Sequence, residues 1–313
     1  MGKRKKSQKI NGWINLIKPY DMGSTPAVSK VRRLFDAQKA GHAGTLDPLA
    51  DGILPIALGE ATKTVPYIQD REKTYIFEVS WGEQRDTDDL EGDVIETSDN
   101  RPDQKSIEEI LPKFIGEIEQ TPPQYSAIKI DGKRAYDLAR SGQDVAIKSR
   151  IVYIEDISII EHDTNKTKFK VLCGKGTYVR SLARDFGIIL GCFGYVSSLH
   201  RSAVGNFTVE NAISLDKLEK ISNIAELYEF LLPVETPLDD ILELAITEAE
   251  ASRIKNGQSL TLISRYDVSR LEQIGCDIKS DYEDEVLITC KQKAIAIAVI
   301  NKTVISPVKV FNL

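Results

Sequence analysis

A segment rich in glycine and proline, residues 41–60, constrains this chain more than any other. It contains four glycines and two prolines. Pro48 has a fixed φ and pushes the residue before it, Asp47, into the extended region. The glycines permit tight turns or the close approach of another backbone or a substrate. We therefore expect a stiff loop that presents the carboxylate of Asp47 and, five residues earlier, the imidazole of His42.

The loop alone leaves the role of its polar residues open. An Asp before a Pro is most often a turn residue, but a positioned, ionised carboxylate can act as nucleophile or base. Asp51 is the rival of Asp47, and its place before Gly52 is typical of a turn acceptor for backbone N–H groups. His42 could be a base, a ligand, a stacking platform or a side chain packed within the loop.

Composition limits the functional class. The 313 residues, 42% of them hydrophobic, suffice for one large domain or two of ordinary size. The four cysteines form no CxxC pair, which indicates reduced thiols and a cytoplasmic location. Three unclustered histidines predict no zinc site. The acidic residues 83–93 lack calcium-loop spacing and are expected to form a solvated loop. No apolar run approaches a membrane span.

The charge is distributed unevenly along the chain. The net charge is −6, yet residues 1–50 carry ten Lys and Arg against three Asp. A local basic face can attract phosphate groups whatever the total charge. For residues 1–9 alone, a basic flexible tail that only aids solubility is the alternative.

Hydrophobic periodicity predicts strands interleaved with helices, without the regular spacing of a parallel β–α–β fold. The pattern predicts an α+β fold with a mixed, largely antiparallel sheet. Ser24 or Thr25 is expected to cap the first helix, and Thr177 a later one. The expected strands are 10–17, 53–58, 74–81, 94–96, 127–130, 150–160 and 167–173. The expected helices begin near residues 25, 106, 134 and 177.

The character of the chain changes after about residue 240. A short helix near 247–255 is followed by strand-like segments separated by turns. We predict a basic tail at 1–9, a main domain at 10–240 and a small β-rich module at 241–313.

Two residues outside the loop, Arg180 and Tyr75, are further candidates for a functional role. Arg180 is expected in the first turn of a helix, where the helix dipole disfavours a cation, so it needs a carboxylate or phosphate partner unless it is a surface residue without a role. Tyr75 begins the strand 74–81. It either packs in the core or stacks on a nucleic-acid base.

Six short segments stand in order between residue 10 and about 210. They are Lys18-Pro19, Gly41-His42-Ala43-Gly44-Thr45-Leu46-Asp47-Pro48-Leu49-Ala50, Lys73-Thr74-Tyr75, Gln124-Tyr125-Ser126-Ala127-Ile128-Lys129, Lys175-Gly176-Thr177-Tyr178-Val179-Arg180 and Ser198-Leu199-His200-Arg201-Ser202. Together these segments resemble the TruB family of tRNA pseudouridine synthases. The tail resembles a PUA-type RNA-binding module, although residues 264–284 are unusual for one.

The resemblance implies isomerisation of uridine to pseudouridine at position 55 in the T loop of tRNA, without metal or cofactor. Asp47 would be the nucleophile, and Arg180 would pair with it and keep it ionised. Tyr75 would stack on the flipped-out uracil. The remaining substrate-binding residues implied are His42, which would splay the T-loop bases, Tyr178 and Leu199, which would line the uracil pocket, and Lys18.

Two other functions share these features. One is an RNA-binding or tRNA-folding protein whose catalysis is dispensable. The other is a guide-RNA-dependent synthase of the dyskerin type, although Leu49-Ala50-Asp51-Gly52 is more similar to the stand-alone bacterial form. We expect a monomer that acts on the tRNA T stem-loop without guide RNA.

Overall fold

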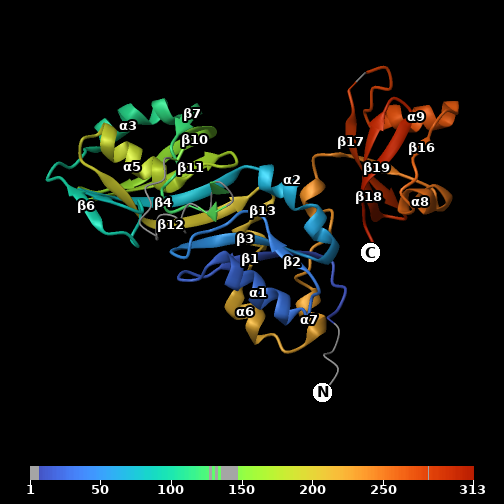
Figure 1. Cartoon of the computed structure of the whole chain (residues 1–313), viewed down its shortest axis with the longest axis horizontal. Helices are drawn as coiled ribbons and strands as arrows, with labels where there is room; N and C mark the ends of the chain where they lie inside the picture. The colour runs from blue at the N-terminus through green and yellow to red at the C-terminus, as the bar shows by residue number, and fades with distance from the viewer. Residues whose placement is uncertain (1–6, 127–128, 131–132, 135–146, 281) are drawn as a thin grey trace.

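A large mixed sheet organises the first two thirds of the chain. The computed structural model describes residues 7–126, 129–130, 133–134, 147–280 and 282–313. In these residues the main path of the sheet runs β14-β1-β3-β12-β4-β11-β10-β7, with β2 beside β3 and β13 beside β12 (Figure 1). The bounds are β1 (Gly12–Lys18), β2 (Ala40–His42), β3 (Ala50–Leu58), β4 (Lys73–Trp81), β7 (Gly116–Gln120), β10 (Arg150–His162), β11 (Lys166–Cys173), β12 (Gly194–Val204), β13 (Phe207–Thr208) and β14 (Ile213–Ser214).

The strand pairing confirms the predicted α+β class. Within this sheet, β1 pairs with β14 and β3 with β12 in parallel, and the other pairs are antiparallel. The alternating segment predicted as a strand at 74–81 is β4, in which Phe77, Val79 and Trp81 are buried. The strands predicted at 150–160 and 167–173 are β10 and β11.

Two hydrophobic cores pack against different halves of the sheet. One lies between α1 (Ser24–Leu34) and the strands β1 and β3. The other lies under α3 (Gln104–Ile110) and α5 (Val179–Ile189), against β4, β10 and β11. Tyr75 of β4 and Leu199 of β12 pack against both cores. The central strands therefore form a seam between the two halves.

Both predicted helix caps are wrong. Gly23 is the N-cap of α1, and no side chain caps that end. The Ser24 hydroxyl instead donates to the Leu46 carbonyl (2.9 Å) and accepts from the Leu46 N–H (2.8 Å). Tyr178, not Thr177, is the N-cap of α5, because the Thr177 hydroxyl donates to the carbonyl of Gly174.

Smaller elements complete this part of the chain. The helix predicted from residue 134 lies mostly outside the described residues, which place Arg134 in a strand. The predicted strand at 127–130 is described only at its end. The remaining bounds are α2 (Val65–Asp70), β5 (Glu83–Arg85), β6 (Val94–Thr97), β8 (Lys129–Ile130), β9 (Lys133–Arg134), α6 (Leu215–Lys220) and α7 (Ile224–Tyr228), with short 3₁₀ turns at η1 (Gly59–Lys63), η2 (Leu111–Phe114), η3 (Val209–Asn211) and η4 (Thr236–Leu238).

A second sheet, in the order β15-β17-β18-β19-β16, occupies the C-terminal part of the chain (Figure 1). Phe311 and Ile297 of this part share a buried cluster with Trp13 and Phe207 of the first. The division at residue 240 stays a prediction. The bounds are β15 (Leu242–Ala245), α8 (Glu248–Lys255), β16 (Leu260–Thr261), α9 (Arg265–Gln273), β17 (Asp284–Cys290), β18 (Lys293–Asn301) and β19 (Val304–Val310).

None of the helices in the described part of the chain combines the length and apolar composition that crossing a bilayer requires.

Gly52 provides a test of the seam between β3 and β12. Its φ is +100°, and a Cβ there would lie 2.2 Å from the Arg201 carbonyl oxygen. Gly52→Ala should lower the free energy of unfolding by about 3 kcal/mol or more, because backbone must shift. Gly191→Ala is the matched control: its φ is +65° but its Cβ would meet open space, so only about 1–2 kcal/mol should be lost. Equal losses in urea denaturation would contradict this.

Candidate active site

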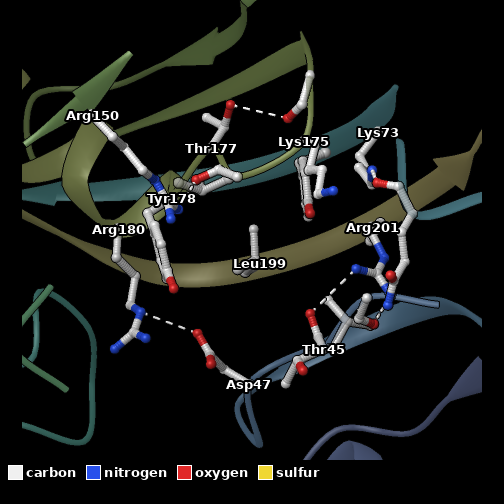
Figure 2. Close-up of a pocket in the computed structure, with 17 residues that line it drawn as sticks. Thr45, Asp47, Lys73, Arg150, Lys175, Thr177, Tyr178, Arg180, Leu199 and Arg201 are labelled. Atoms are coloured by element: carbon white, nitrogen blue, oxygen red, sulfur yellow. Dashed lines mark hydrogen bonds and ion pairs between the residues drawn. The ribbon is translucent and has the colours of Figure 1, made fainter. Parts of the chain in front are cut away.

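A cavity of about 370 Å³ opens at the seam between the two halves of the sheet. Its walls come from the loop between β2 and β3, from β4, from the turn before α5 and from β12 (Figure 2). The lining residues that matter below are Gly44, Thr45, Asp47, Lys73, Tyr75, Arg150, Tyr178, Arg180, Leu199 and Arg201.

Residues 43–49, the Asp47 loop, are fixed by contacts from both sides. Ser24 of α1 holds both backbone polar groups of Leu46. The Lys18 ammonium donates to the carbonyl oxygens of Pro19 (2.9 Å), Met22 (2.5 Å) and, at 3.5 Å, Pro48. These bonds hold the backbone of the loop at both sides, which agrees with the stiff loop that the sequence predicts.

Arg180 meets Asp47 in this cavity. The Arg180 side chain is only 6% exposed, and its Nε lies 3.1 Å from Asp47 Oδ2, whereas the Asp47 side chain is 39% exposed (Figure 2). Nη1 donates to Asp89 Oδ2 and to the Thr87 carbonyl, both at 3.1 Å, and Nη2 donates to the Tyr125 carbonyl at 3.0 Å. Hydrogen bonds from Nη1 and Nη2 thus fix the guanidinium on the side away from Asp47, and its Nε faces the carboxylate.

The expectation of a solvated acidic loop at 83–93 is wrong at its centre. Asp88 and Asp89 are buried because they face two arginines one turn apart on α5. Arg180 pairs with Asp89, and Arg184 pairs with Asp88 at 3.0 Å. The signal that could have indicated this is the i, i+4 spacing of Arg180 and Arg184 on a largely apolar helix.

Aromatic and apolar side chains form the opposite wall. Burial raises the pKa of Tyr75, so its hydroxyl stays protonated. Tyr178 is fixed through its backbone: its N–H donates to Gln120 Oε1 (2.8 Å), and its carbonyl accepts from Gln120 Nε2 (3.1 Å). The guanidinium of Arg150 lies 5.0 Å from the Tyr178 ring centre, a cation–π contact. Leu199 lines the same cavity beside Tyr178 (Figure 2).

Two predicted substrate-binding residues lie outside the cavity lining. His42 is in β2, and burial followed by the charge of Arg201 lowers its pKa, which favours the neutral imidazole. Lys18 is fully buried, and burial lowers its pKa to about 8. Its three carbonyl partners give Lys18 a structural role in the Asp47 loop. Contact of either residue with substrate stays a prediction.

Asp51 is not the turn acceptor that the sequence predicts. It lies in β3, directly opposite His200 of β12, and its Oδ1 is 2.7 Å from His200 Nδ1. Parallel pairing of two segments about 150 residues apart produces this contact, which no local pattern reveals.

The described residues contain no group of three or more His, Cys, Asp or Glu side chains placed to bind a metal ion.

Comparison with known proteins decides the family. Residues 32–179 match the model of the TruB family pseudouridylate synthase N-terminal domain, and residues 180–239 match that of the tRNA pseudouridylate synthase B C-terminal domain. The chain belongs to the TruB family. A relative from Caulobacter sp. (strain K31) is 48% identical over all of both chains, and one from Rhodospirillum rubrum is 47% identical, also over all of both; each is named tRNA pseudouridine synthase B.

Solved structures share the fold of this TruB-family enzyme. A chain of an H/ACA RNP bound to a substrate RNA containing 2′-deoxyuridine has a TM-score of 0.69, with 22% identity over 96% of this chain and 85% of that one. A chain of a Cbf5-Nop10-Gar1 complex has a TM-score of 0.68, with 24% identity over 96% and 84%. At these identities the likeness concerns the fold alone.

Asp89 is expected to support activity through Arg180. Asp89→Asn removes the charge behind the guanidinium, which can then shift away from Asp47. A displacement of about 1 Å can cost on the order of 100-fold in rate. We therefore expect the single-turnover rate of pseudouridine formation in tRNA to be 10- to 100-fold lower. Asp86→Asn is the control, because Asp86 lies in the same hairpin and accepts from Asp93 N–H instead. Equal rates for the two variants would contradict this role.

Asp88 should make stability fall as pH rises. Burial raises its pKa to about 6, against 3.8 for the ordinary group. A raised carboxyl pKa contributes stability that is complete below the unfolded-state pKa and is lost as pH passes the folded-state pKa. The free energy of unfolding of the wild type, minus that of Asp88→Asn, should therefore decrease between pH 4 and 7. Denaturant titrations across this range measure it, and a difference that rises with pH would contradict the assignment.

Proposed function

We propose that this enzyme converts uridine to pseudouridine at position 55 in the T loop of tRNA, with Asp47 as nucleophile. The observation that carries the proposal is the Asp47–Arg180 ion pair, held in a cavity with Tyr75, Tyr178 and Leu199 around it. A carboxylate turned into a cavity and paired on one edge is arranged to attack an electrophilic carbon.

The chemistry requires little beyond positioning. The bond between C1′ and N1 breaks, the uracil turns, and a bond between C1′ and C5 forms. The hydrogen on C5 leaves as a proton and N1 gains one, so the reaction is redox-neutral. Whether Asp47 attacks C1′ or the base, the nucleophile must reach a base removed from its stack.

The cavity suits a flipped-out uridine. Its volume of about 370 Å³ lies within the range of small-ligand pockets. Tyr75, Tyr178 and Leu199 supply apolar and aromatic surface for a uracil ring. Such contacts offset the few kcal/mol that unstacking costs. We propose that His42, outside the cavity, contacts the bases next to the flipped nucleotide.

The relatives favour tRNA as the substrate and action without a guide RNA. Two matched over their whole length bear the name tRNA pseudouridine synthase B. We propose that the chain acts as a monomer on the T stem-loop. Incubation of the protein alone with an unmodified T stem-loop transcript should produce pseudouridine; a requirement for another RNA or protein would contradict this.

Asp47→Asn should abolish pseudouridine formation and leave tRNA binding intact. The side chain keeps its shape but loses the charge and nucleophilicity on which the reaction depends. Release of tritium from tRNA labelled at C5 of uridine measures turnover, because C5 loses its hydrogen. Filter binding measures affinity, and chemical mapping locates the modified base.

Lys30→Gln serves as the control for a lost surface charge, since Lys30 pairs with Glu219 at the surface. Substantial turnover by Asp47→Asn would refute its role as nucleophile. Modification by the wild type at a position other than 55 would refute the proposed target.

A further inference from the structure

Arg201 of β12 is buried to an extent rare for an arginine. It is 1% exposed, yet the end of its side chain forms part of the cavity wall (Figure 2). Nε–H donates to the Ile53 carbonyl at 2.8 Å, Nη2 to that of Gly44 at 3.1 Å and Nη1 to that of Thr45 at 3.3 Å. Arg201 belongs to the segment Ser198-Leu199-His200-Arg201-Ser202, but the sequence alone assigns it no role.

These three bonds join the two ends of the Asp47 loop. Gly44 and Thr45 lie shortly before Asp47, and Ile53 lies after it in β3. One planar guanidinium therefore sets the distance between the segment that enters the loop and the strand that leaves it. A lysine has a single nitrogen and cannot reproduce a fork of donors in fixed directions.

The charge of Arg201 also has no carboxylate partner among the described residues. Carbonyl oxygens of the Asp47 loop and β3 surround it instead. Its field acts on the neighbouring groups: it opposes the burial that raises the pKa of Tyr75, whose hydroxyl lies against the guanidinium. It also contributes to the lowered pKa values of His42 and Lys73. An uncompensated buried charge is costly, so a plain packing role would favour an apolar side chain.

We infer that Arg201 is a positioning residue for the proposed isomerisation, which holds Asp47 through the backbone of its loop and holds the Tyr75 hydroxyl at the cavity wall. The inference rests on the proposed function. The alternative is a structural arginine that stabilises the seam without affecting the reaction.

Two variants test whether the reaction needs both the fork of donors and the charge. Arg201→Lys keeps the charge and loses the fork, whereas Arg201→Gln keeps amide donors and loses the charge. Each should lower the single-turnover rate of tritium release by about 100-fold, while the dissociation constant for tRNA of Arg201→Lys, which keeps the charge, changes by less than about threefold. Circular dichroism melting gives the folded fraction by which each rate is corrected.

Arg270→Lys is the matched control. Arg270 is also mostly buried and donates to the Ala245 carbonyl and to Glu250, but it lies in the C-terminal sheet region. This variant should lose stability and keep its rate. If the two Arg201 variants lose stability but keep the wild-type rate per folded molecule, Arg201 is structural and the inference is overturned.

A double-mutant cycle with Tyr75→Phe tests the second half of the inference. If Arg201 acts partly through the hydroxyl, the combined loss should be at least about fivefold smaller than the product of the single losses. If the fold loss in rate of the double variant equals the product of the two single losses, the link to Tyr75 is overturned. Failure of the proposed function itself is distinct, because the wild type would then release no tritium.

Discussion

The ion pair between Asp47 and Arg180 joins the two halves of the main sheet. Asp47 comes from the half packed against α1, and Arg180 comes from the first turn of α5 on the other half. A guanidinium that is 6% exposed needs partners for its charge: Nε forms the ion pair with Asp47 without a hydrogen bond, and the two Nη atoms donate to Asp89 and to two carbonyls. The geometry of the site and the closure of the seam therefore depend on the same contacts.

The C-terminal sheet docks on the segment that leads into the cavity wall. Lys63 Nζ donates to the Val310 carbonyl at 2.6 Å, and Asn312 N–H donates to Glu60 at 2.9 Å. The same segment continues through α2 to Lys73 and Tyr75. The second sheet is therefore bonded to the segment that precedes β4, the strand that carries Tyr75.

Local patterns predicted what local forces determine. The alternation at 74–81 predicted β4, and the dipole argument for Arg180 anticipated a carboxylate partner, which is present. Two of the errors share one cause: the sequence predicts Ser24 as a cap of its own helix, but Ser24 bonds Leu46, 22 residues away, and it predicts Asp51 in a turn, but Asp51 pairs with His200. A single sequence shows which residue could bond, and only the fold shows which distant partner reaches it.

The electrostatics of the cavity explain how a chain of net charge −6 can receive a polyanion. Asp47 is the one acidic residue among those lining the cavity in the described structure, while the lining cations are Lys73, Arg150, Lys175, Arg180 and Arg201. Lys73 and Arg201 donate to carbonyl oxygens, and within the described ranges neither forms an ion pair with a carboxylate. Since field is local within a cleft, these cations favour a phosphate-bearing substrate where the total charge does not. Arg180 belongs to this group of cations and also forms the ion pair with Asp47, so the same side chains would attract RNA and hold the proposed nucleophile in place.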